Sequence, residues 1–167
     1  ITSNGGDVTV TGQGGGAGSS SNDYGVNIIR GGLISAGGNG AVTVTGTGGT
    51  GTGTEQIGVR IHTAPSQIAS SGGDISVTGQ GGLSGGTKSD GVSLGQGAKI
   101  SAGGTGAVSV NGTAGLGAGN DHIGLLVSSG SKIETADGDV SLTGQGGGSD
   151  GPISHGVDVQ DNSLVVA

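Results

Sequence analysis

The chain has 167 residues, of which 45 are glycine, and it contains no cysteine, methionine, tryptophan or phenylalanine. Five basic against twelve acidic side chains give a formal net charge of −7. This composition excludes a disulfide scaffold and a core built on aromatic side chains. It also lacks the basic stripe that nucleic acid requires, and no apolar run approaches the ~18 residues of a membrane span.

The first repeated phrase alternates branched apolar residues with Thr or Ser and closes with glycine. It occurs at residues 7–12, 41–46, 74–79, 107–112 and 139–144. The closing glycines are 34, 33, 33 and 32 residues apart. Alternation with a period of two predicts a β-strand with one buried face.

Two further phrases keep the same period. The second occurs at residues 25–28, 58–61, 91–94, 124–127 and 156–159. The third occurs at residues 34–36, 68–70, 100–102, 133–135 and 164–166. Three phrases in one register predict three short strands in each unit of about 33 residues.

A single unit of this length cannot enclose a core, but stacked units can. We therefore expect an all-β fold: a right-handed parallel β-helix (β-solenoid) of five coils, forming one continuous array over residues 1–167. The hand follows the general preference of parallel crossover connections. The expected inward columns are Val8/Val42/Ile75/Val108/Val140, Val10/Val44/Val77/Val110/Leu142, Val26/Val59/Val92/Leu125/Val157, Ile28/Ile61/Leu94/Val127/Val159 and Ile34/Ile68/Ile100/Ile133/Leu164.

Alternate coils differ in a way that doubles the repeat to about 66 residues. Coils one, three and five begin the first phrase with Asp7, Asp74 and Asp139, whereas coils two and four have Ala41 and Ala107 there. This alternation keeps like charges two coils apart. Carboxylates on neighbouring strands would be close enough to repel one another.

Glycine recurs at two fixed positions of every coil. The first set closes the first phrase and the second set opens the second phrase: Gly12, Gly46, Gly79, Gly112, Gly144 and Gly25, Gly58, Gly91, Gly124, Gly156. We expect these glycines to supply turn conformations that other residues do not readily adopt.

One acidic residue per coil precedes the second phrase. These candidate Ca²⁺ ligands are Asp23, Glu55, Asp90, Asp121 and Asp150. Ca²⁺ needs six to eight oxygen ligands, but the distance from each acid to the following glycine varies from one to six residues. Solvated loop charge is the alternative interpretation, and no other metal or cofactor site is expected.

Catalysis has little support in the sequence. His62, His122 and His155 fall at different phases of the coil, so we expect no convergence with a fixed Ser or Asp partner. The outward strand positions, which begin with Thr9/Thr11 and Thr43/Thr45, indicate a different possibility. A flat face of hydroxyls suits binding to ice, a glycan or a mineral surface, although Thr and Ser are also ordinary residues of a solvated strand.

The phrases Gly6–Gly12 and Gly40–Gly46, set on Gly/Ser/Thr-rich loops, resemble the repeat regions of large bacterial surface proteins of the filamentous-haemagglutinin-like adhesin type. The resemblance implies secretion, a cell-surface location, a β-helical shaft, and contact with glycans or other cells. Ile1 and Leu164 lie at the same phase, and no polar cap is visible at either end. We therefore expect either a segment of a longer array or a filament subunit that stacks on other copies through its open coil ends. Neither alternative involves catalysis, nucleic acid or membrane insertion.

Overall fold

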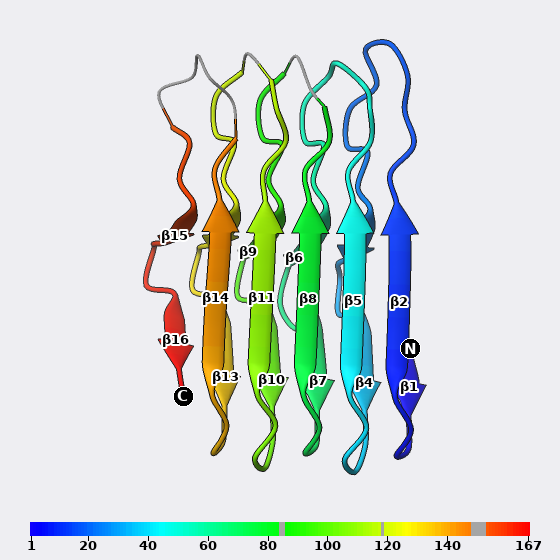
Figure 1. Cartoon of the computed structure of the whole chain (residues 1–167), viewed down its shortest axis with the longest axis vertical. Helices are drawn as coiled ribbons and strands as arrows, with labels where there is room; N and C mark the ends of the chain where they lie inside the picture. Colours follow the sequence, from blue (N-terminus) through cyan, green and yellow to red (C-terminus); the bar gives the residue numbers. More distant parts are fainter. Residues whose placement is uncertain (84–85, 118, 148–152) are drawn as a thin grey trace.

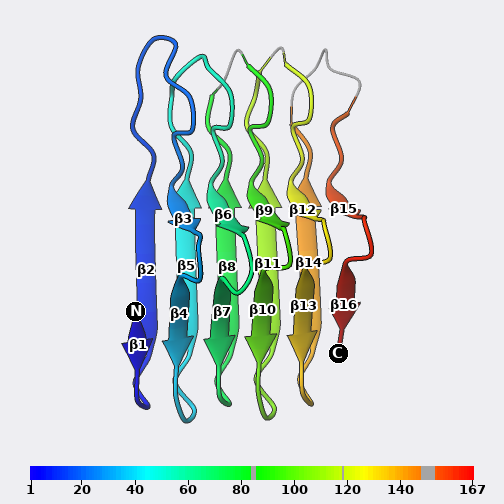
Figure 2. The same ribbon diagram turned by 180° about the vertical axis from the view of Figure 1, so that it is seen from behind.

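The computed structural model is a β-solenoid in which each coil contributes one strand to each of three parallel sheets (Figure 1). The structure describes residues 1–83, 86–117, 119–147 and 153–167. The described residues contain sixteen strands and no helix, so the predicted all-β parallel solenoid of about five coils is confirmed. The sheet formed by the first phrase, sheet B, covers one side of the solenoid. The sheets formed by the second and third phrases, sheets C and A, lie end to end on the other side (Figure 2).

Sheet B contains the longest strands, six residues each, formed by the first phrase. They are β2 (Val8–Gln13), β5 (Val42–Thr47), β8 (Ile75–Gln80), β11 (Val108–Thr113) and β14 (Val140–Gln145). Alternating Val/Ile and Thr/Ser forms strands because the branched chains suit a pleated, half-buried surface.

Sheets C and A are made by the second and third phrases. Sheet C contains β3 (Val26–Ile28), β6 (Val59–His62), β9 (Val92–Gly95), β12 (Leu125–Val127) and β15 (Val157–Val159). Sheet A contains β1 (Thr2–Ser3), β4 (Leu33–Ala36), β7 (Gln67–Ser70), β10 (Lys99–Ala102), β13 (Lys132–Thr135) and β16 (Leu164–Val166). Sheet A therefore has six strands, one more than each of the other two.

The strand register confirms four of the five predicted inward columns over all five coils. The fifth column is confirmed from Ile34 to Ile133, but the prediction of Leu164 as its last member is wrong. Ile133 pairs with Val165, and Leu164 pairs with Lys132 on the outside. Val165 packs against the core, whereas Leu164 is 47% exposed.

The aliphatic columns form one core that runs the length of the solenoid. In the three middle coils the core side chains are almost fully buried, including Ile61, Ile68, Leu94 and Ile100. Five branched side chains per coil fill the space between the sheets, which explains why no aromatic residue is needed.

The glycines at the two fixed positions do not have the turn conformations that the sequence analysis predicted. None of them has a positive φ. They lie where sheets B and C converge, so a Cβ added to Gly79 would overlap the carbonyl oxygen of Gly91. Close backbone approach, and not a left-handed backbone, is therefore what requires glycine here.

Left-handed backbone at residues other than glycine falls almost entirely in two other columns. One lies before sheet C, at Asn22, Glu55, Lys88 and Asp121. The other lies in the bend between sheets C and A, at Arg30, Thr63, Gln96, Ser129 and Asp161. The recurrence of one strained φ in successive coils shows that the turns stack as regularly as the strands.

The two-coil repeat has a structural basis at the start of sheet B. The Asp7 carboxylate accepts a hydrogen bond from the Ala41 backbone N–H at 2.8 Å, and Asp74 accepts from Ala107 at 2.8 Å. The first and third coils are thus each hydrogen-bonded to the alanine coil that follows. The hydrogen bond adds to the charge spacing that the sequence analysis predicted.

Candidate functional site

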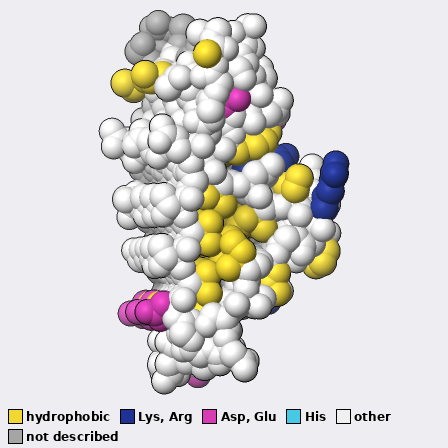
Figure 3. Space-filling view, turned by 90° about the vertical axis from the view of Figure 1, so that its right-hand side faces the viewer, with side chains coloured by type: hydrophobic (Ala, Val, Ile, Leu, Met, Phe, Trp, Pro, Cys, Tyr) yellow, Lys and Arg dark blue, Asp and Glu magenta, His cyan; other side chains and the backbone are white. Residues whose placement is uncertain are grey.

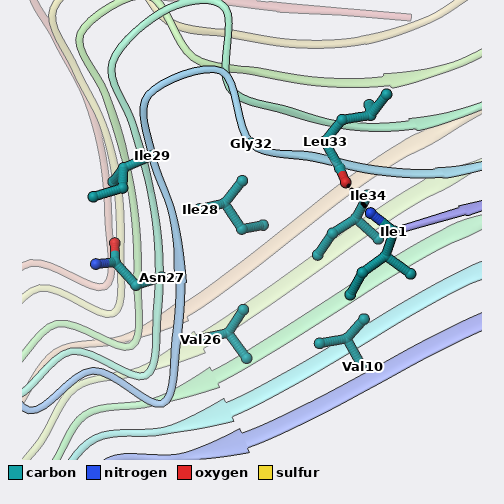
Figure 4. Close-up of a pocket in the computed structure, with 9 residues that line it drawn as sticks. All are labelled: Ile1, Val10, Val26, Asn27, Ile28, Ile29, Gly32, Leu33 and Ile34. Atoms are coloured by element: carbon teal, nitrogen blue, oxygen red, sulfur yellow. Dashed lines mark hydrogen bonds between the residues drawn. The ribbon is translucent and has the colours of Figure 1, made fainter.

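The N-terminal end of the solenoid is an open cross-section of the core. Figure 3 views this end and shows hydrophobic side chains gathered in the middle of it. They border a cavity of about 330 Å³, in which Val10, Val26, Ile28 and Ile34 point inward together with Ile1 (Figure 4). Val10, Val26, Ile28 and Ile34 belong to the same columns that are buried in later coils.

The C-terminal end exposes the other ends of the same columns. Val157 is 41% exposed and Val159 is 43% exposed, although their neighbours Leu125 and Val127 in the preceding coil are fully buried. Val140 and Leu142 of β14 are only partly buried as well. Both ends therefore present aliphatic surface in the register of the coil.

The outer face of sheet B is a regular grid of uncharged polar side chains. The register places Thr9, Thr43 and Ser76 in one outward column, with Thr11, Thr45 and Thr78 in the next. Ser109, Asn111, Ser141 and Thr143 continue the two columns. Thr and Ser hydroxyls thus recur at the spacing of neighbouring strands, and Asn111 interrupts one of the two columns.

The structure does not bring the Ca²⁺ candidates into one ladder. Glu55 and Asp121 lie in the left-handed column with Lys88 between them. Asp23 and Asp90 lie one and two positions further along the coil, and Asp150 lies outside the described residues. In the part of the chain that the structure describes, no three His, Asp or Glu side chains form a group that could hold a metal ion.

Asp90 lies in a groove on the outer face of sheet C and is 2% exposed. The groove has a volume of about 350 Å³ and is also lined by Lys88, Asp121, His155 and Asp158. Asp90 accepts a hydrogen bond from the Ile123 backbone N–H at 3.1 Å. Burial nevertheless raises the pKa of Asp90 to about 7. No signal in the sequence indicated this burial.

We expect Asp90→Asn to stabilise the protein at pH 8 by about 4 kcal/mol and to leave its stability nearly unchanged at pH 3.5. The folded carboxyl titrates near pH 7 and the unfolded one near 3.8. The wild-type protein therefore loses stability as the pH rises between these two values. Asparagine keeps the side-chain oxygen that accepts the Ile123 hydrogen bond but does not ionise, so the variant does not lose this stability. Urea unfolding of both proteins at the two pH values measures the difference. An equal change in the free energy of unfolding at both pH values would contradict this prediction.

The single tyrosine lies at the N-terminal part of the same face. The Tyr24 hydroxyl donates a hydrogen bond to the Glu55 carboxylate and lies 2.8 Å from Asn22 Oδ1, and the Arg60 guanidinium lies 5.1 Å from the centre of the tyrosine ring. Burial, followed by the Glu55 hydrogen bond, raises the pKa of Tyr24 to about 12. The phenol therefore stays neutral and connects two coils.

Two of the three histidines each have a Ser or Asp neighbour, but the two neighbours differ in type and in position on the coil. His62 Nε2 lies 3.1 Å from the Ser93 hydroxyl, and His155 Nδ1 lies 3.1 Å from Asp158. Burial lowers the pKa of His62 to about 4. Among the described residues His62 Nδ1 has no hydrogen-bond partner, so the pair lacks the third group that orients the base in a catalytic triad.

His122 belongs to a column of buried polar side chains that the sequence analysis missed. Gln56, Ser89 and His122 occupy one position in three successive coils, and all three are fully buried. The Ser89 backbone N–H donates to His122 Nδ1 at 3.3 Å, and burial lowers the pKa of this histidine. The imidazole is thus a neutral packing group between the converging loops.

No family model matches the chain, and neither a curated protein nor a solved structure is significantly similar to it. Over the described residues no helix is long and apolar enough to cross a membrane. Function must therefore be inferred from the arrangement of this chain's own residues.

Proposed function

We propose that the chain is shaft material of an extracellular or cell-surface bacterial adhesin or filament, joined through its open coil ends. The observation that carries the proposal is the single register that runs through all five coils and leaves the same aliphatic columns open at both ends. A fold that repeats one cross-section has no inherent length limit, which suits an extended spacer.

The positions of the apolar and polar side chains support a structural role. The buried residues serve the core, and the outer face of sheet B is polar and uncharged. We propose no catalytic function, because among the described residues His62 Nδ1 has no hydrogen-bond partner that could orient the imidazole as a base for Ser93. Secretion is inferred from the resemblance of the repeated phrases to bacterial adhesin repeats.

Immunogold labelling of intact source cells tests this proposal. Antibodies against the purified chain should label the cell exterior along extended surface structures, and permeabilised cells should show no additional interior pool. Antibody depleted on the purified chain is the matched control. Labelling confined to the interior would contradict the shaft proposal.

The hydroxyl grid on sheet B favours a second candidate, a ligand-binding face for ice, a glycan or a mineral surface. Its regular spacing is the specific observation behind it. Thermal hysteresis and glycan-array binding would detect such a function. Thr45→Lys, at the centre of the grid, should abolish either signal, whereas Thr50→Lys, in a loop beyond β5, should preserve it. Absence of both signals in the wild-type chain would eliminate this candidate.

A further inference from the structure

The groove on the outer face of sheet C contains a carboxyl group at a position where the neighbouring coils have isoleucine. Ile57, Asp90 and Ile123 each lie two residues before a paired residue of sheet C, and all three are almost fully buried. Isoleucine serves the fold at this position, whereas an aspartate loses its hydration and destabilises the fold. A local exception that costs stability in an otherwise regular repeat indicates a functional position.

The protein satisfies only one of the two side-chain oxygens of Asp90. Oδ1 accepts a hydrogen bond from the Ile123 backbone N–H at 3.1 Å, and Oδ2 has no hydrogen-bond partner among the described residues. Because Asp90 lines the groove, a molecule bound there can reach Oδ2. A carboxylate oxygen that is nearly buried and has no donor favours a ligand that supplies one.

The charges of the groove favour a cation. Asp121 forms no ion pair with the described residues, and Asp158 is paired with His155 at 3.1 Å. Lys88 is exposed and also forms no ion pair with the described residues. Two incompletely paired carboxyl groups, those of Asp90 and Asp121, outweigh one solvated ammonium, so the groove attracts a positively charged ligand.

Apolar walls fit an organic cation better than a metal ion. Ile123, Leu126 and Ile153 line the groove, whose volume of about 350 Å³ lies within the range of small-molecule sites. A hydrated metal ion would gain nothing from aliphatic walls, and the described residues contain no group of three His, Asp or Glu side chains to hold one. A chain of methylene groups that ends in an ammonium matches both parts of the lining.

We propose that this groove binds an aliphatic primary amine, whose ammonium donates hydrogen bonds to Asp90 Oδ2 and to Asp121. Its methylene groups pack on Ile123, Leu126 and Ile153. The site lies on the side of the solenoid, so the proposal goes beyond the shaft function and is independent of how coil ends join. A free alkylamine and the side chain of a lysine residue share this chemistry, and the experiment distinguishes them.

NMR titration of the wild-type chain tests the site, with the backbone amide of Ile123 as the reporter because this N–H donates to Asp90. We expect pentylamine to shift the Ile123 signal in a saturable manner. Pentanol has the same chain without the charge, and it should bind at least about tenfold more weakly. Nα-acetyl-lysine methylamide presents the same ammonium on a peptide backbone. Tighter binding of this compound would identify a lysine side chain as the ligand, and tighter binding of pentylamine a free amine.

Asp90→Asn is the decisive variant because we expect it to fold at least as well as the wild-type chain. Asparagine keeps the oxygen that accepts the Ile123 hydrogen bond, but it places an NH2 donor where Oδ2 was. Pentylamine should therefore bind at least about tenfold more weakly to this variant. Lys88→Met is the matched variant in the same groove. It removes a competing ammonium and should tighten pentylamine binding about threefold.

The affinity should also follow the ionisation of Asp90. Burial raises the pKa of Asp90 to about 7. Pentylamine should therefore bind at least about tenfold more weakly at pH 5.5 than at pH 8.5, because the protonated carboxyl does not attract an ammonium. Asp90→Asn should lose this pH dependence, and His155→Gln should retain it. The other charged or titratable groups that face Asp90 are Lys88, Asp121, Glu55, His155 and Asp158.

Three results would overturn the proposal. The first is an Ile123 signal that neither amine shifts in a saturable manner. The second is equal affinity of pentylamine and pentanol, or of the wild-type chain and Asp90→Asn for pentylamine, because Oδ2 would then not be the acceptor. The third is loss of binding in Lys88→Met, which would indicate a site for anions. None of these results affects the labelling test of the shaft, because labelling reports where the chain is found.

Discussion

Gly112→Ala should prevent stable folding, with a loss of at least about 3 kcal/mol in the free energy of unfolding. A Cβ on Gly112 would overlap the carbonyl oxygen of Gly124, where sheets B and C converge. The obstacle is backbone on both sides, and it is held by strand pairing in the coils above and below, so it cannot move away cheaply. Circular dichroism and urea unfolding measure the loss.

The control is Gly15→Ala, in a loop of the first coil. Its added Cβ would meet no heavy atom within 4 Å, and its φ is not positive. Alanine should be neutral there, or slightly stabilising through lower entropy of the unfolded chain. Equal destabilisation by the two substitutions would show that the Gly112 column is not a close-approach column.

Leu94→Ala should cost about 3 kcal/mol in the free energy of unfolding. Leu94 is fully buried in the middle of its column, between Ile61 and Val127. The paired strands hold a fixed spacing, so neighbouring coils cannot move together to fill the cavity. The loss should appear as a shift of the urea midpoint with an unchanged slope.

Two valines of the same column provide the matched comparison. Val127 is fully buried, and Val159, which pairs with it in the last coil, is 43% exposed. In dilute solution Val127→Ala should cost about 2 kcal/mol, and Val159→Ala less than about 1 kcal/mol. Equal costs would mean that the C-terminal end is covered in the monomer, contrary to the structure.

The strands and their register could be predicted from the sequence because every coil repeats the same alternation. The error at Leu164 has a specific cause. Leu164, Val165 and Val166 are all apolar, so alternation cannot indicate which of them faces inward. The 32-residue step from Val127 to Val159 in the same coil also applies from Ile133, and it leads to Val165.

The glycine columns could be located but not explained from the sequence. A recurrent glycine indicates either a left-handed backbone or a close approach, and only the spatial convergence of sheets B and C shows which applies. The left-handed positions are instead held by residues such as Glu55 and Lys88, whose side chains give no such signal.

The contacts on sheet C could not be predicted because they are diagonal between coils. His62 reaches Ser93, which pairs not with His62 but with Arg60 two residues earlier. The burial of Asp90 depends on the path of the loops at the end of sheet C. Neither the composition nor the periodicity of the sequence indicates that path. In contrast, the repeat alone indicates which aliphatic side chains lie at the two ends of the core columns.

Cryo-electron microscopy of the chain at high concentration gives the most direct test of the shaft proposal. Stacked coils keep neighbouring strands about 4.8 Å apart, so filaments joined through coil ends should show an unbroken axial repeat of about 4.8 Å. Filaments with this continuous repeat are the predicted result. Particles that remain single coil stacks at high concentration would contradict it.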